Sequence, residues 1–227
     1  MPVTSTNILA LLKSNHLFRG LSNATLEHTA RIAKYRVAER GAVLFHQGDP
    51  GDGFYGIDYG RVRMSSTSSA GREIYFVELG PGDTFGEIAL LDDGPRTASA
   101  IVAEPAAIII IERHAFRSIL RNDNDLCLKM LTRLCERVRW TSELVEDHSF
   151  LSVEAQIAKR IRLLSERFGT DVANGRQLKI TQHDLAAFLG VSRQAINTYL
   201  SRWQHEGWLE VSRGSLCIRD TDRLTRV

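Results

Sequence analysis

Residues 85–98 read FGEIALLDDGPRTA, which places a glycine turn, a carboxylate and a guanidinium within one short stretch. Gly86 lets the backbone approach a ligand closely, Glu87 can accept hydrogen bonds from a ribose hydroxyl, and Arg96 can hold a phosphate in a bidentate fork. Thr97 adds a hydroxyl beside the same anion. The combination favours a nucleotide-like anion over a plain surface ion pair, which would contribute little to stability.

The sequence around this stretch predicts a domain of short antiparallel strands. Eleven of the chain's 17 glycines lie between residues 41 and 94, where they separate short apolar segments. Gly-Asp pairs, which are typical of turns, stand at 48–49, 51–52 and 82–83. Residues 106–111 read as a strand buried on both faces. Together these features predict a small β-barrel or roll.

The composition is that of a globular protein with room for two modest domains, because 43% of the 227 residues are hydrophobic and 25% are charged. The longest uninterrupted apolar run, 106–111, is far too short to span a bilayer. Lys13, His16 and Arg19 interrupt any signal-peptide core. We therefore expect a cytoplasmic protein that has no membrane as a partner.

The cysteines and the known catalytic motifs argue against a metal centre and against an enzyme. Cys127, Cys135 and Cys217 lack Cys-x-x-Cys spacing, which predicts neither a disulfide framework nor a thiolate metal site. A nucleotide hydrolase is the rival, since the predicted pocket sets a carboxylate beside a phosphate. However, the chain has no His-Glu-x-x-His, no Gly-x-Ser-x-Gly and no Walker loop. We expect no catalytic residue, no metal and no cofactor beyond an allosteric ligand.

Residues 124–150 change to a helical pattern that predicts a homodimer. Side chains recur every three or four residues over three heptads, as in a helix that packs against its twin. This predicted seam comprises Cys127, Leu131, Leu134, Val138, Thr141, Val145 and His148. A helix that lies on its own barrel is the alternative. Thr141 and its neighbour Ser142 either bond back to the helix or meet a polar ligand at the dimer interface.

The C-terminal part predicts a nucleic-acid partner. Residues 151–227 carry 12 Lys and Arg against 8 Asp and Glu, which is a weak signal for a polyanion. Residues 181–205 read TQHDLAAFLGVSRQAINTYLSRWQH and predict two helices joined by a glycine turn, as in a helix-turn-helix. Residues 208–218 follow as a β-hairpin wing, and residues 169–175 are expected to form a loop.

Local capping signals support the two short helices. Thr181 and Asp184 have the spacing of a capping box at the start of the first helix. Gly190 makes the turn, and Ser192 can cap the second helix.

Over nearly its whole length the chain resembles the CRP/FNR family of transcription regulators, in the branch of the cyclic AMP receptor. The resemblance rests on the motif at 85–98, on Trp-Thr-Ser-Glu at 140–143 in the long helix and on the helix-turn-helix, in that order. It implies an α+β fold with three parts. These are a cyclic-nucleotide-binding, jelly-roll-like β-roll at 1–123, a dimerisation helix and hinge at 124–150, and a winged helix-turn-helix DNA-binding domain at 151–227.

The resemblance also implies a role for each residue of the ligand site. Glu87 would hold the ribose, Arg96 would hold the cyclic phosphate, and Thr141 would contact the purine. Ser142 would reach the nucleotide bound in the partner subunit. The full set of ligand-binding residues that it implies is Gly86, Glu87, Ile88, Arg96, Thr97, Thr141 and Ser142.

Cyclic AMP is the first choice of allosteric ligand, because both hydroxyls at Thr141 and Ser142 are present. Thr97 keeps cyclic GMP, or both nucleotides, open, since a hydroxyl there also resembles cyclic-GMP-binding relatives and can donate as well as accept. A family member that binds DNA without nucleotide control is the remaining alternative. Arg96 is expected to bind the charge of the ligand and not to stabilise the core, so Arg96→Ala should leave the protein folded.

For DNA, the resemblance implies a homodimer on a palindromic double-stranded operator, with RNA polymerase as a further partner of an activator. Arg193 suits a guanine, whereas Gln194 stands where the cyclic AMP receptor branch has Glu and favours adenine. Thr198 stands in place of a second Arg, so we expect a different operator. The candidates for base contacts are Arg193, Gln194, Asn197 and Thr198. The candidates for phosphate contacts are Lys179, Thr181, Gln182, Ser192, Arg202 and Arg213.

Overall fold

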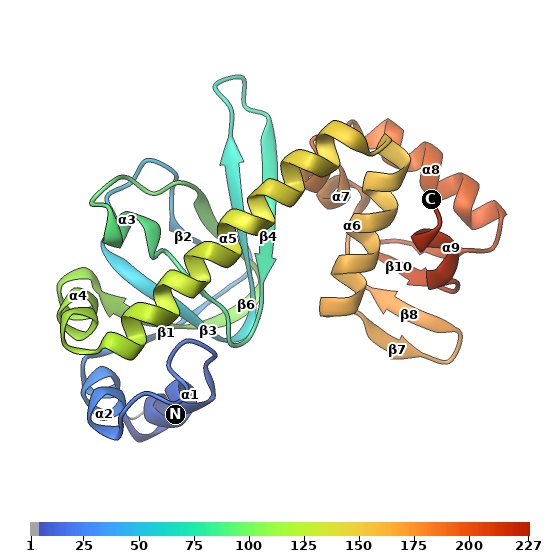
Figure 1. Cartoon of the computed structure of the whole chain (residues 1–227). Coiled ribbons are helices and arrows are strands. Elements are labelled where there is room, and N and C mark those ends of the chain that lie inside the picture. Colours follow the sequence, from blue (N-terminus) through green and yellow to red (C-terminus); the bar gives the residue numbers. More distant parts are fainter. Residues whose placement is uncertain (1–4) are drawn as a thin grey trace. The chain divides into compact units, whose positions relative to one another are not determined.

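The structure is a computed structural model that describes residues 5–227 (Figure 1). The chain divides into two compact units: the first runs to Ser66 and includes residues 76–138, and the second comprises residues 67–75 and 139–227. The first unit is built on a six-stranded sheet, and the second contains the C-terminal helices with a four-stranded sheet. This mixture of helix and sheet confirms the predicted α+β class.

The sheet of the first unit is antiparallel in its paired strands and runs in the order β1-β6-β3-β4, with β2 on β6 and β5 on β3. Its register shifts between Ile57 and Val62, where Gly60 has a φ of +79°. A Cβ at Gly60 would collide with the carbonyl oxygen of Pro105, so only glycine fits this bulge. The strands are β1 (Lys34–Ala38), β2 (Val43–Phe45), β3 (Gly53–Thr67), β4 (Glu73–Leu79), β5 (Thr84–Phe85) and β6 (Ser99–Glu112).

Two apolar cores lie on the two faces of this sheet. One forms where the helices pack on Phe54, whose ring stacks on Phe116 with the centroids 4.3 Å apart. Ile109 and Ile111 of β6 join that core, whereas Ile108 points into the other. The prediction of a strand buried on both faces is therefore confirmed for β6. The helices that contribute to the first core include α1 (Ser5–Ser14), α2 (Asn23–Ile32), α4 (Arg113–Asn122) and the start of α5 (Asn124–Phe150).

The helix-turn-helix of the second unit forms through the predicted local signals. Thr181 Oγ1 accepts from the Asp184 backbone N–H at 3.0 Å, and the Asp184 carboxylate accepts from the Thr181 N–H at 3.3 Å, which confirms the capping box. Gly190 ends the first helix with a φ of +64°. Ser192 Oγ accepts from the Ala195 N–H at 3.1 Å and caps the next helix. These helices are α7 (Gln182–Leu189) and α8 (Arg193–His205).

The wing belongs to a larger sheet than the expected hairpin. The strands β9 (Leu209–Ser212) and β10 (Ser215–Ile218) pair as predicted, and β10 also pairs with β8 (Gly175–Leu178). The segment expected as a loop contains β7 (Thr170–Val172), which pairs with β8. The expectation of a plain loop was wrong, because residues 170–172 pair with β8 across a two-residue turn at 173–174, as in a β-hairpin. The remaining helices of this unit are α6 (Val153–Phe168) and α9 (Thr221–Thr225).

The long helix α5 carries two apolar lines rather than the one predicted seam. Cys127 and Leu134 are half-buried, and the Cys127 thiol donates to the Leu120 carbonyl at 3.0 Å, so these members of the predicted seam do not lie on the exposed face. The alternative, a helix lying on its own barrel, therefore describes the start of α5, where Leu126 and Met130 join the first core, while the predicted dimer face stays a prediction. A separate exposed line, spaced by three and four residues, comprises Leu128, Leu131, Cys135, Val138, Ser142 and Val145.

None of the helices in residues 5–227 combines the length and the apolar character that crossing a membrane requires.

Candidate functional site

The stretch at 85–98 folds back on itself and lines a pocket in the first unit. After β5 the chain turns at Gly86 and enters the short helix α3 (Ile88–Leu91). Gly86 has a φ of +86°, and a Cβ there would lie 2.7 Å from Arg96 Nη1 and 3.0 Å from the Tyr55 ring. The pocket encloses about 240 Å³ that is open to solvent. It is lined by Phe45, Met64, Gly86, Glu87, Ile88, Ala89, Arg96, Thr97, Ala98 and Arg137.

Arg96 forms the floor of this pocket and is also part of the core. It is only 2% exposed, and its guanidinium lies 4.1 Å from the centre of the Phe45 ring. Nη1 donates to the Gly86 carbonyl at 2.7 Å, and Nη2 donates to the Gly53 carbonyl at 2.8 Å and to Asp52 Oδ1 at 2.7 Å. The expectation that Arg96 does not serve the core was wrong, because these bonds tie three backbone segments together.

One donor of Arg96 is left without a partner. Its Nε is buried and makes no hydrogen bond within the described part of the chain. A buried N–H that lacks an acceptor costs free energy, and a charged one costs more. An anion that enters the pocket could remove this deficit by accepting from the guanidinium edge.

Asp52 and Tyr55 complete the polar network behind Arg96. Tyr55 Oη donates to Asp52 Oδ1 at 3.1 Å. Loss of water around Asp52 opposes ionisation, but the hydrogen bonds from Arg96 and Tyr55 outweigh it and hold the pKa of Asp52 below its ordinary value. Burial, together with the charge of Asp52, raises the pKa of Tyr55 to about 12. The carboxylate therefore stays ionised and competes with any ligand anion for Arg96.

Glu87 is a buried carboxylate whose ion-pair partner the sequence did not reveal. Its side chain is 8% exposed, and Oε1 lies 3.0 Å from Arg137 Nη1 of α5. A carboxylate buried to this extent needs a cation or several donors. The sequence pattern alone does not single out Arg137 as part of the ligand site. The one signal that could have pointed to it is its place one helical turn before Thr141.

Thr141 and Ser142 do not line the pocket. Both are exposed on α5 and belong to the second unit, and Ser142 lies on the exposed apolar line of that helix. The structure thus brings together Gly86, Glu87, Ile88, Arg96 and Thr97, and it leaves Thr141 and Ser142 outside the pocket.

The first turns of α8 present the predicted base-contacting residues at the surface of the second unit. Arg193, Gln194 and Thr198 are exposed, while Ile196 on the opposite side of the helix is fully buried. Within the described residues, the side chains of Arg193 and Gln194 have no hydrogen bond or ion pair. Asn197 is half-buried, and its Oδ1 lacks a partner there.

The candidates for phosphate contacts differ in their exposure to solvent and in whether their side chains already form other interactions. Lys179 and Arg213 are exposed, and Arg213 lies between β9 and β10. The hydroxyls of Thr181 and Ser192 already act as helix caps. Arg202 pairs with Glu154, which also accepts from Trp203 Nε1 at 3.2 Å. Gln182 is half-buried in the first turn of α7.

Over residues 5–227, no group of three His, Cys, Asp or Glu side chains lies close enough together to hold a metal ion. The three cysteines are all free thiols.

Known proteins match both parts of the chain. A family model of the cyclic nucleotide-binding domain matches residues 35–123, and a model of the Crp-like helix-turn-helix domain matches residues 155–227. A CRP-like cAMP-activated global transcriptional regulator of Mycobacterium tuberculosis is 33% identical over 92% of this chain and 95% of its own length. The cyclic AMP receptor protein of Thermus thermophilus is 28% identical over 95% of this chain and 98% of its own.

Among solved structures, the c-di-GMP responsive global regulator CLP of Xanthomonas campestris has the same fold. It superimposes with a TM-score of 0.77 over 87% of this chain and 99% of its own, at 20% identity.

Proposed function

Since the chain belongs to the CRP/FNR family of cyclic nucleotide-binding transcription regulators, we propose that its allosteric ligand is cyclic AMP and that its dimer binds a palindromic DNA operator. The observation that carries this proposal is the buried guanidinium of Arg96, whose Nε lacks a partner in a pocket that also holds the carboxylate of Glu87. A cyclic phosphate offers the acceptor, and a ribose hydroxyl offers the donor.

In the proposed complex Arg96 and Thr97 bind the cyclic phosphate, and Glu87 accepts from the ribose 2′-hydroxyl. Arg137 orients the Glu87 carboxylate through their 3.0 Å ion pair. At Gly86 and Ile88 the backbone approaches the nucleotide closely. Thr141 contacts the purine, and Ser142 contacts the nucleotide of the partner subunit, which requires the dimer. The names of the two relatives, one cAMP-activated and one a cyclic AMP receptor, support the choice of nucleotide.

Cyclic GMP is the second candidate, and one observation favours it. Thr97 lies in the pocket, and its hydroxyl can donate to or accept from a purine edge. A regulator that has lost nucleotide control is disfavoured, because the chain retains both a buried Glu87 and a buried Arg96.

For DNA, the proposed binding domain is residues 151–227 and the proposed reading helix is α8. Arg193, Gln194, Asn197 and Thr198 contact base edges in the major groove, and two such helices in a dimer sit about 34 Å apart, one turn of DNA. Lys179 and Arg213 contact phosphates from either side, and Arg202 does so by leaving Glu154. The nucleotide binds one of two existing arrangements of the dimer more tightly and thereby shifts their populations. RNA polymerase is the proposed partner of the DNA-bound dimer, with the β7–β8 hairpin as the candidate contact.

The first experiment is calorimetric titration of the full chain with cyclic AMP and with cyclic GMP, followed by gel shifts on a palindromic operator library. We expect micromolar binding of cyclic AMP and nucleotide-dependent DNA binding. Arg96→Gln should abolish both responses, whereas the matched variant Arg117→Gln, whose guanidinium pairs with Asp93 at 2.8 Å outside the pocket, should retain them. Tight DNA binding that neither nucleotide alters would reject the proposal.

A further inference from the structure

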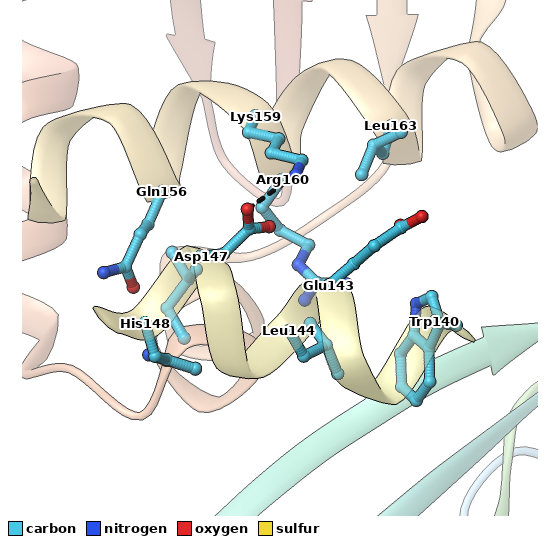
Figure 2. A pocket seen from close by; sticks show the side chains of 10 residues that line it. Trp140, Glu143, Leu144, Asp147, His148, Gln156, Lys159, Arg160 and Leu163 are labelled. Atoms are coloured by element: carbon cyan, nitrogen blue, oxygen red, sulfur yellow. Dashed lines mark hydrogen bonds and ion pairs between the residues drawn. The ribbon is translucent and has the colours of Figure 1, made fainter. Parts of the chain in front are cut away.

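A second hollow lies wholly within the second unit, between the end of α5 and α6. It encloses about 450 Å³ that is open to solvent. Figure 2 shows side chains from both helices directed into the space between them. None of the roles proposed above uses this groove.

Arg160 is the unusual member of this groove. Its side chain extends from α6 toward α5 (Figure 2) and is half-buried. Among residues 5–227 its guanidinium has no hydrogen bond and no ion pair; it lies over the face of Phe188, 5.5 Å from the ring centre, and feels the charge of Asp147. Burial lowers the pKa of Arg160, and the charge of Asp147 offsets only part of this shift.

The nearby carboxylates do not neutralise Arg160. Asp147 is held by Lys159 Nζ at 2.7 Å, the contact that is dashed in Figure 2. Glu143 is exposed on α5 and, over the part of the chain that is described, forms no ion pair. The guanidinium of Arg160 therefore lies in the groove with the charge of Asp147 nearby but with no hydrogen-bonded or ion-paired anion in the described part of the chain.

One end of the groove is lined by apolar side chains. Trp140 and Leu163 approach the same end from the two helices (Figure 2), and Leu163 is 41% exposed. Apolar surface beside an unpaired cation is the chemistry that recognises an organic acid rather than a bare ion.

We infer that this groove binds a small organic oxyanion, a carboxylate or phosphate monoester whose anion lies on the guanidinium of Arg160 and whose apolar part packs against Trp140 and Leu163. Arginine matches both anions in bidentate geometry, so the shared chemistry is an oxyanion joined to an apolar group. Arg160 also lies over Phe188 in the first helix of the helix-turn-helix. A ligand bound to Arg160 would therefore affect the packing of that helix against α6, from a site separate from the nucleotide pocket.

The test uses the full chain saturated with cyclic AMP, so that the nucleotide pocket is closed to the probes. Phenyl phosphate, benzoate and inorganic phosphate are titrated by calorimetry at constant ionic strength. We expect phenyl phosphate or benzoate to bind and inorganic phosphate to bind at least about tenfold more weakly, since it lacks the apolar part. Whichever of the first two binds more tightly identifies the natural anion as phosphate or carboxylate.

Three variants separate binding from folding. Arg160→Gln should weaken the tighter probe by about tenfold or more, the loss of one charge-assisted hydrogen bond. Arg162→Gln, on the same helix but paired with Glu166 at 2.7 Å, should leave binding unchanged. Glu143→Gln removes a negative charge from the groove and should tighten binding about two- to fivefold, a gain that a damaged fold cannot produce.

Absence of probe binding to the unaltered protein would overturn the inference, as would equal affinity in Arg160→Gln. Weaker binding in Glu143→Gln would also overturn it, since Glu143 would then be part of a site for a cation or a donor group.

Discussion

The charged and polar side chains of the nucleotide pocket are buried and hydrogen-bonded, whereas those on the face of α8 are exposed to solvent. In the pocket, Arg96 is buried and bonded to two carbonyls and a carboxylate, and Glu87 is buried against Arg137. On α8, Arg193 and Gln194 project into solvent, and only the backbone beneath them is held, by the Ser192 cap and the buried Ile196. A change in the pocket should therefore affect both stability and binding, whereas a change on α8 should affect binding alone.

The largest effect is expected from Arg96→Ala. The variant leaves the carbonyls of Gly53 and Gly86 and the carboxylate of Asp52 without their donor, which should lower the free energy of unfolding by about 3 kcal/mol. Cyclic AMP affinity should fall by more than about 100-fold. Chemical denaturation and calorimetry measure the two losses. Arg117→Ala serves as the control, and loss of affinity with unaltered stability would contradict the core role of Arg96.

Gly86→Ala sharpens the comparison through geometry rather than charge. The new methyl group would meet Arg96 Nη1 at 2.7 Å and the Tyr55 ring at 3.0 Å, so it should push the guanidinium from its site. We expect cyclic AMP affinity to fall about tenfold or more, together with about 1–3 kcal/mol of stability. Gly48→Ala is the matched control, since Gly48 has a similar φ of +90° but open space around it. Equal losses of affinity in the two variants would mean that backbone strain, not the contact with Arg96, is responsible.

On α8, Gln194→Ala and Thr198→Ala should change which operator is preferred, by about 1–3 kcal/mol at the affected base pair, and leave the melting temperature unchanged. Arg213→Ala, between β9 and β10, should instead weaken all sequences alike and lower the salt dependence by about one counterion. Selection from an operator library and salt titrations distinguish the two outcomes. A clear fall in melting temperature for Gln194→Ala would break the contrast between the two regions.

The smallest effect concerns acid stability. Because the folded pKa of Asp52 lies below its ordinary 3.8, its ion pair with Arg96 adds stability above that value, and this is lost as pH falls through the folded pKa. Asp52 is 74% exposed, so the contribution should stay below about 1 kcal/mol. Unfolding free energies of the natural chain and of Asp52→Asn should differ most near pH 6 and converge only as pH falls below the folded pKa of Asp52. A constant difference would assign the effect to packing.

Features that depend on neighbouring residues could be predicted from the sequence, and features that depend on distant residues could not. The Thr181–Asp184 capping box, the Gly190 turn and the grouping of Gly86, Glu87 and Arg96 each arise within a short stretch of chain. The pairing of Glu87 with Arg137 joins residues that are far apart in sequence, and no local pattern announces it.

Errors arose where one segment serves two purposes. On α5, one apolar line includes half-buried residues such as Leu134 and another is exposed at Leu131 and Val138, and a count of apolar spacings merges the two. Likewise Arg96 was assigned wholly to a ligand, because sequence composition does not reveal that the backbone carbonyls of Gly53 and Gly86 both accept from its guanidinium.

The caps of the helix-turn-helix have a kinetic consequence. Because Thr181, Gly190 and Ser192 complete both helices from within the chain, α8 is fully formed before any DNA is present. In the proposed DNA complex, each encounter with a site then needs no folding step, and its duration depends on how quickly the exposed side chains exchange counterions with the phosphates. A search conducted in this way proceeds at the pace of diffusion and sliding, and specificity enters only through the time spent at each site.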